Sequence, residues 1–341
     1  MVHYVNPCTE IHPWRHRDPI RFQSRYLKTF FGIDWHILRC ALNKNSGFVI
    51  SGWNRLSLIT LIALLALLKR PFIFWTDTPD VQRSRSFIKK LLRRVVHRIV
   101  FSGATAVMGT GKPGVDGLLA MGCPNPKLVS FPFFVNLDAS KKADKERTYL
   151  RRDGRILFAS SGRLQNNIKG YDIALMSLAR ARDLSMNNDF EYHLAGSGPD
   201  EEKLKKLAAN LGLVDQVRFR GWLESNELVE LLHRCDVFIH PALYDPFPVA
   251  VLEAMAAGMV VLGSDASGSV RDRIVNGVNG FIHSVRNVIQ LSDQIANLMQ
   301  NPEIISIISK RARQTAEQWP ASRGVAIIKS ILLKHSQDIK H

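Results

Sequence analysis

Residues 240–282 read HPALYDPFPVAVLEAMAAGMVVLGSDASGSVRDRIVNGVNGFI and decide the fold class of the chain. An apolar helix led by proline is predicted over Pro248–Ala257, because proline fits the first turn of a helix. A short β-branched strand is predicted directly after it, over Val260–Gly263. A buried helix followed at once by a buried strand is typical of a parallel sheet with helices on both faces.

The same alternation continues upstream of this stretch. Short apolar strands are predicted over Arg155–Ser161, Phe190–Ala195, Val217–Gly221 and Asp236–His240. Amphipathic helices are predicted between them, over Tyr171–Arg182, Asp200–Asn210 and Asn226–Arg234. The second half therefore predicts a Rossmann-like domain, in which ligands bind outside the carboxyl ends of the strands.

The first half repeats this pattern less cleanly, with strand candidates at Ser46–Ile50, Pro71–Trp75, Ala104–Met108 and Leu128–Phe131. A polar, charged stretch over 136–152 separates the two halves. We predict an α/β chain of two Rossmann-like domains that face a cleft, the first of them shortened and divergent. The predicted bounds are 1–140 for the first domain, 141–152 for the linker, 153–320 for the second domain, and 321–341 for a C-terminal helix that could pack back on the first domain.

The charge of the chain is concentrated in its first half. The 341 residues include 46 Lys and Arg against 30 Asp and Glu, a net charge of +16. An apolar content of 46% excludes the disordered and fibrous classes. Residues 1–150 hold 23 basic and 9 acidic side chains, whereas residues 151–341 hold 23 and 21. This asymmetry predicts a polyanionic partner for the first domain, either nucleic acid or an anionic membrane.

The cysteines and the apolar runs point to a protein without disulfides or membrane spans. Cys8, Cys40, Cys123 and Cys235 show no paired spacing, so reduced thiols are expected. The first residues do not resemble a signal peptide. The longest apolar run, Leu56–Leu68, has 13 residues, fewer than the roughly 20 that span a bilayer. It is predicted to form a buried helix.

Several short motifs follow one another in a fixed order along the second half. They are Gly162-Arg163, Lys169-Gly170, GSGP at 196–199, VRFRGW at 217–222, Asp245 and Glu253 eight positions apart, EAMAAG at 253–258, and NGVNGF at 276–281. In this order and spacing, the set resembles the retaining nucleotide-sugar glycosyltransferases of the GT-B fold, family four (glycosyl transferases group 1). The resemblance covers residues 155–320 and rests on the ordered set, since each motif alone would be weak.

The resemblance implies a retaining enzyme that uses a UDP- or GDP-sugar as donor, with no tightly bound cofactor and no metal ion. The sequence holds no Asp-x-Asp metal motif, which agrees with a metal-free site. By the same resemblance, Arg163 and Lys169 form the phosphate-binding pair and Asp245 contacts the donor sugar near its reacting end. The family usually has Glu at this last position, and Asp is one methylene shorter, so its reach or the sugar it accepts could differ.

The chemistry of these residue types suits a sugar nucleotide. Arginine and lysine bind a diphosphate and stabilise it as the leaving group. The Glu253 carboxylate can accept hydrogen bonds from both ribose hydroxyls. Other donor contacts are predicted at Phe247 and Val249, which open a helix, and at Gly162, Gly221, Trp222 and Leu223. Each of these assignments has a plainer alternative. Arg163 and Lys169 could be solvated loop charges, Glu253 could be an acid on the helix surface, and Gly221–Leu223 could be a structural turn.

The first domain departs from the family more strongly. The glycine-rich loop after the first strand is absent, and the stretch FIFWTDTPD at 72–80 holds Thr76 and Asp77 where the family often has a catalytic histidine. Asp77 could orient the acceptor hydroxyl or take its proton, or it could be a turn cap. His12 and His16 are further candidates for the missing histidine, with surface positions as the alternative.

A formal GxGxxG occurs at Gly109–Gly114, after a predicted strand and before an apolar helix. It comes late in its domain and contains Pro113, so it is interpreted as a strand–turn–helix connection and not as a dinucleotide or Walker loop.

A basic amphipathic helix is predicted from Arg83 to Val100, RSRSFIKKLLRRVVHRIV, with no acidic residue. Its cations, Lys89, Lys90, Arg93, Arg94 and Arg98, could lie at the headgroups of an anionic membrane or at an acceptor. The alternative is a half-buried helix with a solvated basic edge. A nucleic-acid groove would require aromatic platforms, and only Phe87 is present.

We therefore predict a glycosyltransferase, cytoplasmic and peripheral on the inner face of the cell membrane. It would act on a membrane-linked glycan or lipid in polysaccharide or lipopolysaccharide biosynthesis, without nucleic acid as a partner. Another GT-B enzyme, such as an epimerase or a phosphorylase, is the first alternative. A non-enzymatic module that binds membranes or nucleic acid is the second.

Overall fold

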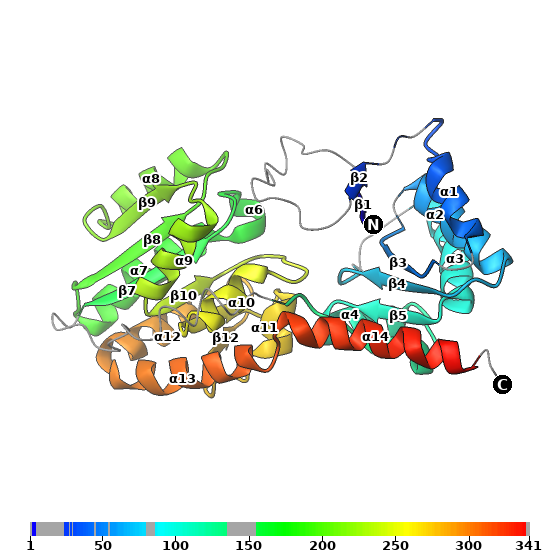
Figure 1. The fold of residues 1–341 in the computed structure, drawn as a ribbon. Helices are drawn as coiled ribbons and strands as arrows, with labels where there is room; N and C mark the ends of the chain where they lie inside the picture. The colour runs from blue at the N-terminus through cyan, green and yellow to red at the C-terminus, as the bar shows by residue number, and fades with distance from the viewer. Residues whose placement is uncertain are drawn as a thin grey trace.

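The computed structural model describes residues 2–4, 24–26, 28, 30–43, 46–53, 55–79, 86–134 and 155–338 (Figure 1). The predicted linker 141–152 lies outside these residues, as do His12, His16, Cys8 and the start of the basic helix at 83–85. Among the described residues, Cys40, Cys123 and Cys235 form no disulfide.

The first parallel sheet has the strand order β3-β4-β5-β6. Its strands are β3 (Phe48–Ser51), β4 (Phe72–Thr76), β5 (Ala106–Gly109) and β6 (Leu128–Ser130). The helical segments of this half are α1 (Trp35–Leu42), α2 (Leu56–Leu67), α3 (Phe87–Gly103), α4 (Gly111–Ala120) and the 3-10 turn η1 (Asn125–Lys127). Two further strands, β1 (Val2–Tyr4) and β2 (Ser24–Tyr26), form a separate parallel pair.

The second parallel sheet has the order β12-β11-β10-β7-β8-β9. Its strands are β7 (Ile156–Ser161), β8 (Phe190–Ala195), β9 (Val217–Gly221), β10 (Val237–His240), β11 (Val260–Ser264) and β12 (Phe281–His283). The helices are α6 (Asn166–Lys169), α7 (Tyr171–Ser185), α8 (Glu201–Asn210), α9 (Ser225–Arg234), α10 (Val249–Ala256), α11 (Gly268–Arg273), α12 (Val288–Gln300) and α13 (Glu303–Glu317). The strand order reverses between β7 and β10, and such a switch point is where open α/β sheets bind ligands.

The second sheet has an apolar core on each face, which explains its strand patterns. One core contains Phe158 and Tyr192 with side chains of α7 and α12. The other contains Leu157 and Ala159 with side chains of α9 and α10. Adjacent strand residues therefore enter opposite cores, as the predicted parallel sheet requires.

Each predicted strand is present, and its ends differ from the prediction by no more than two residues. The predicted helix Pro248–Ala257 is shorter in the structure, where α10 spans Val249–Ala256. Pro248 is the N-cap and not part of the first turn, because its ψ of 120° is extended.

The C-terminal helix α14 (Ala321–Asp338) leaves the second domain and lies along the first (Figure 1). Its side chains Ile327, Ile328 and Ile331 pack against a small core that contains Ile73 and Met108 of the first sheet. The helix thus joins apolar side chains near the C-terminus to those of the first sheet in one cluster.

The loops after β4 and β5 contact the second domain. The hydroxyl of Thr78 donates a 3.0 Å hydrogen bond to the carbonyl oxygen of Pro246. The backbone N–H of Lys112, at the start of α4, donates a 2.6 Å bond to the Asp272 carboxylate at the end of α11. These contacts join the first domain to the loop after β10 and to α11.

The GxGxxG segment forms part of this junction. Gly109 ends β5 and Gly111 begins α4, so the segment is a strand–turn–helix connection. Gly111 has φ +66°, and a Cβ there would lie 2.5 Å from a ring carbon of Phe247. Glycine is therefore required by the approach of the second domain and by the left-handed backbone.

Candidate functional site

The centre of the candidate site is an ion pair between Lys169 and Asp245. The Lys169 Nζ lies 2.5 Å from Asp245 Oδ2, and both side chains are mostly buried. Lys169 ends α6 and Asp245 lies in the loop after β10. These loops are held together because the N–H of Leu243 donates a 2.8 Å bond to the carbonyl oxygen of Ile168. Two residues 76 positions apart thus meet at the carboxyl ends of β7 and β10.

Glycines allow the loops around this pair to approach each other closely. Gly170 has φ +65°, and a Cβ there would lie 2.5 Å from the carbonyl oxygen of Pro241. Gly162 has φ +145°, and its Cβ would lie 2.8 Å from the Tyr171 hydroxyl. Arg163 follows Gly162 in the loop between β7 and α6, and its side chain is exposed.

His240 belongs to the same centre, although it was not among the predicted site residues. It is the last residue of β10 and is 3% exposed, with its Nε2 3.6 Å from Asp245 Oδ2. Burial, the charge of Lys169 and the nearby His283 lower the pKa of His240 to about 3. Its imidazole is therefore neutral at physiological pH. The available signal was a histidine at the ligand-binding end of an apolar strand.

The start of α10 offers donors beside a buried carboxyl group. The N–H groups of Phe247 and Val249 donate to no other residue that the structure describes. Glu253 lies on the same helix, and burial raises the pKa of its carboxyl group. Within the described chain, this carboxyl group has no hydrogen bond or ion pair, so it is available to a ligand.

Asp77 approaches from the first domain, directly after β4. Burial raises the pKa of its carboxyl group, the hydrogen bond from the Thr78 N–H opposes this rise, and the negative charge of Asp245 adds to it. The Thr78 N–H bond to Asp77 Oδ1 measures 2.8 Å. Asp77 and Asp245 therefore interact electrostatically, one from each domain.

The turn after β9 holds the three predicted base-contact residues. Gly221 has φ +64°, and its carbonyl oxygen accepts a 2.7 Å hydrogen bond from the Gly196 N–H. Trp222 is 47% exposed, whereas Leu223 packs against the apolar core beside α9 and α10. The turn is thus anchored to the loop after β8 and presents a large aromatic surface.

The basic helix is less buried than its apolar pattern indicates. Val96, Ile99, Val100 and Phe101 in the second half of α3 pack in the first domain's core. Four apolar side chains of the first half are more than 50% exposed: Phe87, Leu91, Leu92 and Val95. Among the described side chains of α3, the expected apolar stripe is therefore packed only in the second half of the helix.

The cations of this helix differ in their surroundings. Arg94 and Arg98 are exposed. Arg93 lies over the Trp53 ring, 6.0 Å from its centroid. For Lys89 and Lys90 the structure describes the helical backbone only.

The described residues show neither a metal-binding cluster nor a membrane-spanning helix. They include no group of three or more His, Cys, Asp or Glu side chains that could hold a metal ion. No helix within the described ranges is long and apolar enough to cross a membrane.

Several curated proteins resemble part of the chain, and two of them illustrate the range. Glycogen synthase of Mycobacterium tuberculosis (strain CDC 1551 / Oshkosh) is 31% identical over 153 residues, which are 45% of this chain and 36% of that protein. The N,N'-diacetylbacillosaminyl-diphospho-undecaprenol alpha-1,3-N-acetylgalactosaminyltransferase of Campylobacter jejuni is 36% identical over 94 residues, 28% of this chain and 25% of that protein. The matches thus span little more than a third of these relatives at most.

The chain shares its fold with solved structures, and its sequence matches a family model. The crystal structure of Anabaena HepE in complex with UDP superposes with a TM-score of 0.73 at 18% identity, covering 92% of this chain and 86% of that one. This likeness confirms the predicted fold class, mixed α/β of the GT-B type. Residues 141–315, just over half of the 341 residues, match the model for glycosyl transferases group 1. The chain belongs to the glycosyl transferases group 1 family.

Proposed function

We propose that this protein is a retaining glycosyltransferase that moves a sugar from a UDP- or GDP-sugar to a membrane-linked glycan or lipid. The observation that carries the proposal is the Lys169–Asp245 pair at the switch point of the second sheet, 2.5 Å long and faced by Asp77 of the first domain. Family membership supports the reaction class, and UDP in the HepE crystal structure supports the class of donor.

In this proposal, the donor diphosphate lies against Lys169, Arg163 and the N–H groups of Phe247 and Val249. Gly162 is required in this loop, because its φ is +145° and a Cβ there would lie 2.8 Å from the Tyr171 hydroxyl. The ribose hydroxyls bind Glu253, and the base lies over the turn Gly221–Leu223. Two cations and two backbone donors match the charge of a diphosphate.

The transfer breaks the bond between the anomeric carbon and the phosphate oxygen, and the electron pair leaves with the nucleoside diphosphate. Lys169 and Arg163 stabilise that developing charge. The acceptor oxygen bonds to the same carbon on the same face, and its proton passes to the departing phosphate oxygen. Asp77 orients the acceptor hydroxyl. Neutral His240 packs beside Asp245 without a positive charge that would compete with Lys169.

The membrane-linked acceptor is inferred from α3. Exposed Arg94 and Arg98 lie on the same helix as the exposed Leu91, Leu92 and Val95. Cations and apolar side chains on one helix suit the interface of an anionic membrane, where each cation contributes about 1 kcal/mol. The name of the Campylobacter jejuni relative includes a diphospho-undecaprenol acceptor, which supports this choice. The protein would then act at the inner face of the cell membrane, in polysaccharide or lipopolysaccharide biosynthesis.

Thermal-shift measurements with UDP, GDP, ADP and CMP test the donor site. We expect UDP or GDP to raise the melting temperature and Glu253→Gln to remove most of that shift. Glu253→Gln should fold, because burial already disfavours the charged carboxylate. Glu303→Gln, an exposed acid on α13, is the matched control and should keep the full shift. The donor assignment fails if no nucleotide raises the melting temperature, or if Glu253→Gln responds like the control.

A further inference from the structure

A cavity of about 320 Å³ lies on one face of the second sheet, beside α9. The polar side chains that line it are Arg155, Glu191, His193, Arg218, Arg220 and Arg234. They come from β8, β9, α9 and the residue before β7. None belongs to the proposed donor site. A volume of this size is near the lower end of the range for small-molecule sites.

The charge on this sheet face is unusual for a parallel sheet. Along β9, Val217 and Phe219 pack in the core shared with α7, whereas Arg218 and Arg220 line the cavity. Neighbouring strands of a covered parallel sheet normally present apolar residues on both faces. Polar residues that depart from such a pattern are expected mainly at functional sites.

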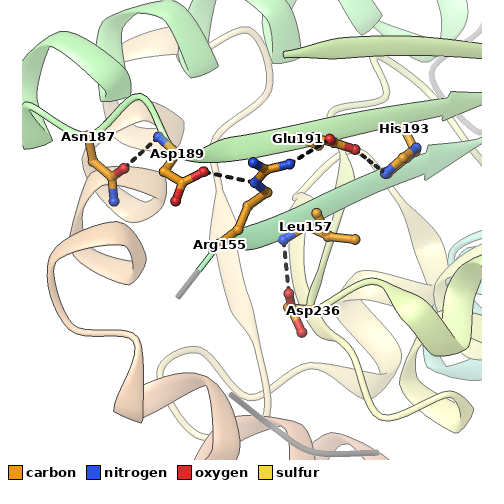
Figure 2. A network of polar contacts seen from close by, with 7 residues as sticks. All are labelled: Arg155, Leu157, Asn187, Asp189, Glu191, His193 and Asp236. Atoms are coloured by element: carbon orange, nitrogen blue, oxygen red, sulfur yellow. Dashed lines mark hydrogen bonds and ion pairs between the residues drawn. The ribbon is translucent and has the colours of Figure 1, made fainter. Parts of the chain in front are cut away.

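The cavity has more positive than negative charge. Glu191 already has two partners, because its carboxylate lies 2.9 Å from Arg155 Nη1 and 3.3 Å from His193 Nε2 (Figure 2). Arg155 also contacts Asp189 at 2.8 Å (Figure 2). The single carboxylate in the lining is thus engaged, while three more arginines line the same cavity.

Two of those arginines can turn toward a ligand without breaking an ion pair. The Arg218 guanidinium makes one long contact, 3.4 Å, to the carbonyl oxygen of Val214. Arg220 has no side-chain hydrogen bond or ion pair to any residue that the structure describes. Both side chains are exposed at the edge of the sheet, so a ligand can reach them from solvent.

His193 reports the positive potential inside the cavity. It is 8% exposed, and its Nδ1 is buried without a hydrogen-bond partner among the described residues. Burial lowers its pKa, and although Glu191 opposes this, the charges of Arg220, Arg234 and Arg218 lower it further. A bound anion would offset these three charges.

We propose that this cavity is a second ligand site, which binds the phosphoryl group of a small soluble molecule. Planar guanidinium groups from β9, from α9 and from the residue before β7 surround one volume. Guanidinium binds phosphate through paired hydrogen bonds. A phosphoryl ligand would offset part of the excess positive charge that Arg218 and Arg220 bring to this cavity. The site lies on a sheet face and not at the carboxyl ends of the strands, so it does not depend on the proposed donor.

Calorimetric titration with pyrophosphate at fixed ionic strength, with UDP present at saturation, tests the proposal. Saturating UDP keeps pyrophosphate out of the proposed donor site. We expect Arg218→Gln and Arg220→Gln each to weaken pyrophosphate binding about tenfold, the effect of losing one hydrogen bond to a charged group. Arg180→Gln on α7, an exposed arginine against the opposite face, is the control and should bind like the wild type. The pKa of His193, followed by NMR, should rise when pyrophosphate binds.

Equal binding by the wild type, Arg218→Gln and Arg220→Gln would overturn the site, and so would complete loss of pyrophosphate binding when UDP is added. Flotation with phosphatidylglycerol vesicles separates a soluble ligand from a lipid headgroup. Loss of flotation in Arg218→Gln would overturn the assignment to a soluble molecule. Failure of UDP itself to bind concerns the donor proposal alone, since the pyrophosphate titration of the three variants can be run without UDP.

Discussion

The hydroxyl of Thr78 donates a 3.0 Å hydrogen bond to the carbonyl oxygen of Pro246. Thr78 follows Asp77, and Pro246 follows Asp245, so this bond joins the two loops that carry the facing carboxyl groups. The contact that joins the two domains thus lies one residue away from each of these acids. The geometry of the candidate site therefore depends directly on the domain junction.

Substitution of Gly111 should weaken this junction. A Cβ at Gly111 would lie 2.5 Å from the Phe247 ring and 2.9 Å from the Asp272 carboxyl group. Gly122 has a similar positive φ of +89°, but a Cβ there would meet nothing within 4 Å. Gly111→Ala should therefore lower the free energy of unfolding by about 1–3 kcal/mol more than Gly122→Ala, the typical cost of overpacking. Chemical denaturation measures both, and equal losses would show that the junction tolerates the extra methyl group.

Removal of the Lys169 charge should impair the reaction. The Lys169 ammonium would stabilise the departing diphosphate, so Lys169→Met should reduce kcat by about 10²-fold or more, the typical effect of losing one transition-state partner. The control is Lys203→Met, which removes an exposed lysine on α8 whose Nζ lies 3.0 Å from Asp200 Oδ1. Release of nucleoside diphosphate from UDP- or GDP-sugars provides the assay. A similar loss of kcat in both variants would contradict a catalytic role for Lys169.

His240 should make the protein less stable in acid. Its pKa is about 3 in the folded state, against an ordinary value near 6.5, so between these pH values only the unfolded chain takes up the proton. The contribution of neutral His240 to the free energy of unfolding is complete above pH ~6.5 and is lost as the pH falls toward ~3. In this range the free energy of unfolding falls by up to about 1.4 kcal/mol per pH unit. The free energy of unfolding of His240→Asn should lack this part of the pH dependence. If the free energies of unfolding of the wild type and of His240→Asn changed equally with pH, this role of His240 would be excluded.

The architecture of the second domain could be predicted because its strands are short, apolar and buried. Phe190, Tyr192 and Leu194 all enter one core, so strand β8 was predicted with its observed ends. Proline at the start of α10 was less informative, since both the first turn and the N-cap accept its fixed φ. Only the backbone ψ distinguishes them, and the sequence does not specify it.

The candidate site was predictable as a set of residues but not as a set of contacts. Lys169 and Asp245 were both selected, yet their direct pairing depends on the bond between Ile168 and Leu243. His240 was missed because a histidine at the end of an apolar strand is also compatible with a core position. The exposure of Leu91 and Leu92 could not be predicted either, because helical periodicity defines an apolar face without showing what covers it.

Membrane binding through α3 should need both its cations and its exposed apolar side chains. Anionic headgroups would attract Arg94 and Arg98 while Leu91 and Leu92 enter the acyl boundary, so Arg94→Gln/Arg98→Gln and Leu91→Gln/Leu92→Gln should each reduce flotation with phosphatidylglycerol vesicles several-fold. Raising the salt concentration should weaken binding of the wild type, because it screens exposed charges. Met186→Gln, at an 88% exposed apolar residue of the second domain, is the control and should float like the wild type. Equal flotation with neutral phosphatidylcholine vesicles, or unchanged flotation of both α3 variants, would exclude this helix as the membrane contact.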